Sequence, residues 1–171
     1  MDGLYVGADI GGVAAKVWTS GPHSNFDDSG LLGGIHAGYN VGFSNGVVAG
    51  VEADLANTGI DRTDGPATFK SRWQGSLRAR AGYAVDRLLP FVTVGAAISN
   101  PLLRGWEGSR PTLVGWTAGG GIEYALDQHW LLRGDMRYSD FGKQDFPFAD
   151  GMVAKVRLSE VSGTIGLSYK F

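Results

Sequence analysis

The chain lacks several features that would identify common classes of protein. It has no cysteine, which excludes a disulfide scaffold, a thiol nucleophile and a cysteine-based metal site. It has no apolar run of about 20 residues, so a membrane-spanning helix is not expected. A secretory signal is also missing, because Asp2 and Gly3 follow Met1 where basic and apolar regions would be needed. If the protein is exported, we expect this chain to be the mature segment, with its signal peptide removed.

The chain also lacks a strong excess of charge of either sign. The 15 basic and 17 acidic residues give a net charge of −2, so nucleic acid is not an expected partner. Glycine, in contrast, is abundant: 28 of 171 residues, against an average of about 7 %. The glycines follow no collagen-like period, and the length suits a single domain over residues 1–171.

Apolar and polar residues alternate with a period of two along nearly the whole chain, and helical periodicity is almost absent. The alternation predicts eight antiparallel strands, at residues 3–19, 30–43, 46–57, 68–85, 88–100, 111–126, 129–142 and 157–171. Short turns, such as the Asn-Gly turn at 44–46, alternate with four long polar loops, at 20–29, 58–67, 101–110 and 143–156. An even number of strands with short turns at one end and long loops at the other is typical of outer-membrane barrels.

One face of the predicted strands is apolar, and its aromatic residues gather near the strand ends. This placement resembles the two aromatic girdles of membrane barrels. The predicted girdle residues are Tyr39, Phe43, Trp73, Tyr83, Trp116, Tyr124, Trp130, Tyr138, Tyr169 and Phe171. The alternative is a soluble barrel of lipocalin type with the apolar face inside, but an apolar ligand cavity would place its aromatics in mid-strand.

The other face carries charges of both signs among small residues. Five acids and six bases nearly cancel, which suits a sealed interior where charges must pair. The predicted lumen charge network consists of Asp9, Glu52, Asp54, Arg72, Arg78, Arg80, Glu123, Arg133, Asp135, Arg137 and Lys170. Glycine, serine and threonine leave room for these long side chains in a lumen only eight strands wide. The predicted fold is therefore all-β: an eight-stranded antiparallel up-and-down transmembrane β-barrel.

Two predicted hairpins carry a family resemblance. WQGSLRARAGYAVDRLLPFVTVGAAIS (73–99) and GWTAGGGIEYALDQHWLLRGDMRYSDFG (115–142) resemble hairpins of the small alphaproteobacterial outer-membrane β-barrel family. This family of OmpA-like barrels includes major surface antigens and haem-binding proteins. The opening GLYVGADIGG and the closing IGLSYKF are similar to it as well. The resemblance implies a bacterial outer-membrane location amid lipid and lipopolysaccharide. It also implies a C-terminal aromatic residue that the outer-membrane assembly machinery reads.

Few residues suggest chemistry. His36 falls on the polar face and is interpreted as a structural lumen histidine, and His129 as a turn residue. The lipid-facing positions offer no His/Ser/acid set of the kind that outer-membrane deacylases use. We therefore expect no enzyme activity, no metal and no cofactor. The expected function is that of an outer-membrane structural and surface protein, closed by its internal charge network and exposing four loops.

Two alternatives stay open. The charged interior is also compatible with a narrow pore. The second alternative is a surface module that binds haem, another external ligand or a host surface. Aromatic residues in polar loops can mark such a binding surface. The loop ligand candidates are His23, Trp106, Phe146 and Phe148.

Overall fold

The computed structural model describes residues 2–19, 26–59, 62–64, 67–103, 113–147 and 153–171, with side chains for 2–14, 29–58, 73–99, 113–142 and 159–171. The described residues form nine strands: β1 (Gly3–Thr19), β2 (Phe26–Gly42), β3 (Val47–Gly59), β4 (Arg62–Asp64), β5 (Ala67–Tyr83), β6 (Leu88–Leu103), β7 (Leu113–Ala125), β8 (Trp130–Pro147) and β9 (Val153–Lys170). Within these described ranges, no helix is both long enough and apolar enough to cross a membrane.

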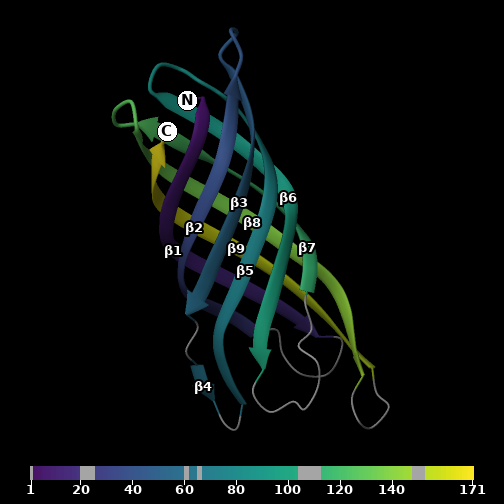
Figure 1. Cartoon of the computed structure of the whole chain (residues 1–171). Coiled ribbons are helices and arrows are strands. Elements are labelled where there is room, and N and C mark those ends of the chain that lie inside the picture. The colour runs from purple at the N-terminus through teal and green to yellow at the C-terminus, as the bar shows by residue number, and fades with distance from the viewer. Residues whose placement is uncertain (1, 20–25, 60–61, 65–66, 104–112, 148–152) are drawn as a thin grey trace.

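The strands form a closed, tilted barrel (Figure 1). Each long strand pairs antiparallel with its neighbours in the chain, and β1 pairs with β9 to close the sheet. β3 pairs with β5, while the three-residue β4 extends this hairpin by pairing with β5. The barrel therefore has eight strands in up-and-down order, and the predicted fold class is confirmed.

The strands extend further toward the loops than the sequence predicted. The prediction of a loop over 143–156 was wrong, because β8 continues to Pro147 and β9 begins at Val153. Likewise, β2 begins at Phe26 rather than at residue 30. Backbone hydrogen bonds hold these extensions together, and a ladder needs no alternating apolar face once it leaves the apolar part of the wall. Periodicity alone therefore predicted these strands to be too short at the loop end.

The opposite end carries the short turns and both termini (Figure 1). Gly46 has φ 84°, a conformation that side chains disfavour, and its N–H donates to the Phe43 carbonyl at 3.0 Å. In the last short turn, the Asp127 carboxylate accepts hydrogen bonds from the backbone N–H groups of His129 and Trp130, both at 2.7 Å. These bonds favour the ionised carboxylate and hold the pKa of Asp127 below its ordinary value.

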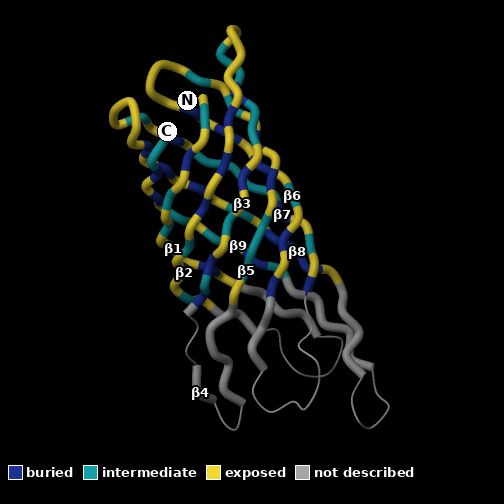
Figure 2. The backbone as a smooth tube through the Cα atoms, in the orientation of Figure 1, coloured by how far each residue is buried: buried dark blue, intermediate teal, exposed yellow. Residues whose placement is uncertain are grey.

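Burial alternates along the strands (Figure 2). On β5, Arg78 and Arg80 are buried, whereas Leu77 is 64 % exposed. The largest fully buried side chain is Arg78, so the interior of the barrel is polar and its exterior is apolar. This is the reverse of a soluble barrel with an apolar cavity, and the lipocalin-type alternative does not fit.

Candidate functional site: the filled lumen and the apolar wall

Glu52 on β3 is the acid at which the polar side chains of the lumen meet. Its carboxylate accepts hydrogen bonds from Arg78 on β5 and from both terminal nitrogens of Arg133 on β8, at 2.5 and 3.0 Å. The Tyr5 hydroxyl on β1 donates to Glu52 at 2.7 Å and accepts from Arg80 at 2.8 Å. Tyr5 from β1 and Arg133 from β8 thus cross the lumen to one carboxylate, which is 1 % exposed and pairs with its direct neighbour Arg78 on β5.

Two further carboxylates extend the network toward the loops. Arg78 lies 2.9 Å from Asp54 and 3.7 Å from Asp135. Arg137 bridges the same two carboxylates, at 3.1 Å and 3.5 Å. Asp54 therefore meets two guanidinium groups, and Asp135 meets three, because Arg133 also lies 3.4 Å from it. Such sharing is needed here, because a buried charge that lacks its partner is strongly destabilising.

Phe91 on β6 inserts an aromatic ring among these charges. The guanidinium carbons of Arg80 and Arg133 lie 4.3 and 5.0 Å from its ring centre, within cation–π range. Arg80 also pairs with Glu123 on β7 at 2.5 Å. Gly121 provides the space for the ring, since a Cβ there would lie 2.9 Å from Phe91 Cζ.

A second polar group crosses the seam between β1 and β9. His36 Nδ1 lies 2.6 Å from Asp9 Oδ2, and His36 Nε2 lies 2.7 Å from Ser168 Oγ. Gly7 is the direct partner of His36 on one side and of Ser168 on the other. A Cβ on Gly7 would lie 2.5 Å from His36 Nε2, so the missing side chain lets the imidazole reach from β2 to β9.

The order Ser168, His36, Asp9 is that of a hydrolase triad. Ser168 is fully buried, however, and the backbone around it belongs to the β1–β9 and β8–β9 ladders, which occupy the N–H groups that an oxyanion hole would need. The arrangement therefore links three strands at the seam. Sequence parity placed His36 inside, but only the β1–β9 register brings Ser168 to it. Among the residues with known placement, no cluster of three His, Asp or Glu is arranged to hold a metal.

Apolar side chains lie at both ends of this polar interior. Val48, Leu89 and Leu131 occupy the first inward positions of β3, β6 and β8 after the short turns, and each is at most 4 % exposed. Toward the loops, two apolar clusters point inward: Val13, Leu32 and Ala56, and Ala97, Leu113 and Phe141. The charged cluster thus has apolar side chains toward both ends, and at the loop end these share the lumen with polar groups such as Glu160, which pairs with Gln74.

The outer wall carries the aromatic residues predicted as girdles. Three strands carry one on the turn side and one on the loop side of the apolar wall: Tyr83 and Trp73 on β5, Tyr124 and Trp116 on β7, and Trp130 and Tyr138 on β8. The ten residue steps from Trp73 to Tyr83 span about 33 Å along the strand. With the usual tilt of 35–45° this is about 25 Å along the barrel axis, the height of a membrane barrel's apolar band.

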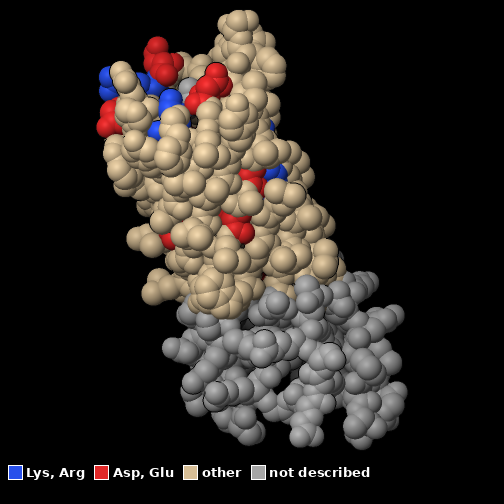
Figure 3. Space-filling model, in the orientation of Figure 1, with Lys and Arg blue, Asp and Glu red and all other residues tan. Residues whose placement is uncertain are grey.

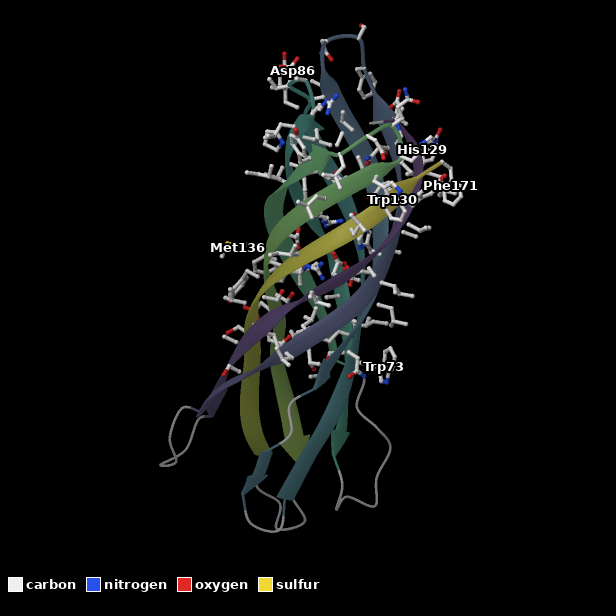
Figure 4. The ribbon with its side chains drawn as sticks, turned by 90° about the vertical axis from the view of Figure 1, so that its left-hand side faces the viewer. Trp73, Asp86, His129, Trp130, Met136 and Phe171 are labelled. Carbon is white, nitrogen blue, oxygen red and sulfur yellow. The ribbon has the colours of Figure 1, made fainter. Side chains whose placement is uncertain are left out.

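The remaining aromatics gather at the short-turn rim. Tyr169 packs edge-on against Trp130 and Phe171, with ring centres 5.3 and 5.2 Å apart, and His129 stacks on it at 5.5 Å. Tyr39 and Phe43 are exposed on the same part of the wall. Figure 4 shows Trp130 and Phe171 at this end and Trp73 toward the loops. On the face seen in Figure 3, most of the visible charge lies at the short-turn rim.

Three of the residues predicted for the lumen charge network are not placed in it by the structure. Asp9 pairs with His36 rather than with an arginine. Lys170 lies half-buried at the short-turn rim, and among the described side chains it has no ion-pair partner. Arg72 and the loop ligand candidates His23, Trp106, Phe146 and Phe148 lie outside the described side chains, so their roles stay predictions.

Sequence reasoning missed two buried acids and one buried phenol. Glu160 accepts a hydrogen bond from Gln74 at 2.6 Å, and Asp140 is 4 % exposed. Parity alone could have found Glu160 and Tyr5. It could not have found Asp140, because the register of β8 and β9 shifts between Asp140 and Lys143, which breaks the alternation. The predicted balance of five acids to six bases therefore counted too few acids.

Comparison with known proteins identifies the barrel. The family model of the outer membrane protein beta-barrel domain matches residues 2–171. The chain belongs to this family. The 31 kDa outer-membrane immunogenic protein of Brucella melitensis is 32 % identical over 203 residues, covering 99 % of this chain and 83 % of the relative. The 22 kDa outer membrane protein of Rhizobium leguminosarum bv. viciae is 31 % identical over 144 residues, covering 83 % of this chain and 67 % of the relative.

The fold agrees with a solved outer-membrane structure. Neisserial surface protein A superposes with a TM-score of 0.64 over 98 % of this chain and 97 % of its own, at 21 % identity. The predicted family and the predicted outer-membrane location are confirmed. For a member of the outer membrane protein beta-barrel domain family, the apolar wall meets lipid, and the end with short turns faces the periplasm.

Proposed function

We propose that the protein is a non-enzymatic structural and surface protein of the outer membrane, with a barrel that its own side chains close. The observation that carries the proposal is the filled lumen, in which buried ion pairs have apolar side chains toward both ends. Such a barrel is a stable carrier for the outward loops. An outer-membrane surface protein needs this property whatever the loops contact.

The filled lumen supports closure in two ways. Glu52, Arg78 and Glu123 are each at most 1 % exposed, whereas a water-filled channel would wet its charged lining. An ion entering from the periplasm would also have to pass Val48 and Leu131, which offer nothing to replace its hydration shell. A barrel of eight strands leaves just enough interior for side chains.

The seam residues support a non-enzymatic role. Ser168 has a hydrogen-bonded base in His36 but no exposed surface that a substrate could reach. The lipid-facing positions around it are apolar, as on β9, where Val161, Ile165 and Leu167 point outward. The role that fits these contacts is to hold β1, β2 and β9 together where the barrel closes.

Conductance in planar lipid bilayers tests the proposal. The refolded barrel, first checked for the heat-dependent shift in gel mobility of a folded membrane barrel, should show no unitary openings in potassium chloride. A double variant, Leu89→Ala with Leu131→Ala, should leak, because it removes apolar side chains from the periplasmic end of the lumen. Stable unitary steps in the unmodified protein would show that the lumen is a pore and overturn the proposal.

We also propose that the outer-membrane assembly machinery recognises the C-terminal strand. Phe171 directly follows β9, and its side chain is 69 % exposed next to Tyr169. A Phe171→Ala variant should insert more slowly into vesicles that contain the machinery, while its unassisted refolding into detergent stays unchanged. Equal rates with the machinery would contradict this assignment.

A further inference from the structure

A groove runs across the lipid-facing side of β3, β2, β1, β9 and β8. Its volume is about 1120 Å³ and its lining is overwhelmingly apolar. The side chains that border it project strongly, with Leu31 78 %, Ile10 74 % and Met136 67 % exposed. In Figure 4, Met136 stands out from the barrel wall, between the levels of Trp73 and Trp130.

Strand register explains the shape of the groove. One row of paired residues reads Gly33, Ile10, Ile165 and Gly134 from β2 to β8. The next row toward the loops reads Leu31, Gly12, Gly163 and Met136. Large side chains in one row therefore stand beside glycines in the next, which gives the wall a fixed relief of ridges and hollows.

The barrel itself does not require these glycines. A Cβ on Gly134 or Gly163 would have no atom within 4 Å. On the lumen side the situation is the opposite, since a Cβ on Gly11 would collide with the backbone of β9. Glycine in the interior of a strand weakens it and often marks a place where another molecule comes close. The reason for the outer glycines therefore lies outside the barrel.

The groove rises toward the outward end of the wall. A smaller groove shares Leu31 with it and continues to Ser29 on β2. Starting from Tyr138, a predicted girdle residue, the row of paired residues runs through Val161 and Ala14 to Ser29, with no further aromatic. The groove thus opens toward the loop-side interface along a row in which Tyr138 is the one aromatic among the described side chains.

We propose that this groove binds one acyl chain of a lipid A-type glycolipid of the outer leaflet. The occupant must be hydrocarbon, because the groove is continuous with the wall that faces the apolar part of the bilayer and water does not fill it. The glycolipid is favoured because the groove extends from the middle of the wall to its loop-side edge, and the loops of this family face outward. A chain between Leu31 and Met136 gains dispersion contacts on three sides, and its headgroup lies at the interface near Ser29.

Native mass spectrometry of the detergent-solubilised barrel, titrated with hexa-acylated lipid A, tests the proposal. The unmodified protein should retain one lipid A molecule. Gly163→Leu fills the groove and should weaken retention about tenfold or more. Gly134→Leu should act in the same way and serves if the first variant folds poorly. The matched control is Gly75→Leu on the outer wall of β5, where a Cβ meets only ordinary contacts, and it should bind like the unmodified protein.

Three results would overturn the assignment. Equal retention by Gly163→Leu, Gly75→Leu and the unmodified protein would show that the groove holds no lipid. Equal retention of lipid A and of phosphatidylethanolamine would show that the groove does not select the glycolipid. A dimer of the unmodified protein that Gly163→Leu dissociates would assign the groove to a second copy of the chain.

Discussion

The two faces of the β1–β9 seam use glycine for opposite reasons. Inside, Gly7 has no room for a side chain, because the ring of His36 fills the space above it. Outside, Gly12 and Gly163 face each other across the same pair of strands, with nothing from the barrel above Gly163. The comparison shows that the inner face is shaped by its own side chains, whereas the outer face is completed by the membrane.

Polarity separates the two faces in the same way. An inner charge is tolerated only with its partner, as Glu52 is with Arg78 and Arg133. An outer side chain such as Ile165 needs no protein partner, because hydrocarbon solvates it. Substitutions on the inner face should therefore destabilise the barrel when they remove the partner of a charge. Substitutions on the outer face should destabilise it when they introduce a charge.

The largest effect is expected at the centre of the lumen. Glu52→Leu leaves Arg133 and Arg78 without their shared acid, and we expect a loss of about 3–5 kcal/mol in the free energy of unfolding. Urea unfolding in lipid vesicles measures this. The control is Ala53→Leu, the next residue, which points to lipid and should change the stability by less than about 0.5 kcal/mol. Equal effects of the two variants would contradict the assignment of the faces.

A charge introduced on the outer wall should lower the free energy of unfolding somewhat less than the loss of Glu52 does. Ile165→Arg places a guanidinium in the middle of the apolar band, with an expected loss of about 2–4 kcal/mol by the same measurement. The same change at Phe171, on the rim, should cost about 0–1 kcal/mol. Equal losses in the free energy of unfolding for arginine at residues 165 and 171 would argue against a lipid-facing wall.

Glycine substitutions sharpen the comparison at the seam. Gly7→Ala displaces His36 from Ser168, so we expect a loss of about 1–3 kcal/mol from the broken buried contact. Gly12→Ala, five residues along the same strand, meets only the Gly30 carbonyl oxygen at 3.8 Å and should be neutral or stabilising by about 0.4–1 kcal/mol. Matching losses for both variants would mean that the His36 contact contributes nothing.

The smallest effect is expected at the short-turn rim, outside both faces. The folded-state pKa of Asp127 is lowered, so its hydrogen bonds stabilise the turn fully above the unfolded value of about 3.9 and are lost as the pH falls through the folded value. The amide resonances of His129 and Trp130 should shift only below a pH of about 4. In Asp127→Asn they should not respond to acid. An acid response that persists in this variant would assign the shift to another group.

Much of this architecture could be predicted from residue parity. Alternation on β5 separated Arg78 and Arg80 from Leu77, and it placed both faces of the wall correctly. Parity could not reveal which residues meet across the lumen, because the contact of Tyr5 with Glu52 depends on shear and side-chain length. It also failed at Asp140, where a shift in register interrupts the alternation. The groove depends on the register of β1 with β9, which joins the two ends of the chain.

The most direct test of the central claim is an accessibility scan along β7. The chain has no cysteine, so single cysteines can be placed at each residue from 114 to 124 and spin-labelled in lipid vesicles. The labels at 114, 116, 118, 120, 122 and 124 should be relaxed by oxygen dissolved in the lipid, and those between them should be shielded. A period of two with this phase is the predicted result. The opposite phase, or no alternation, would contradict a barrel with its polar face sealed inside and its apolar face in lipid.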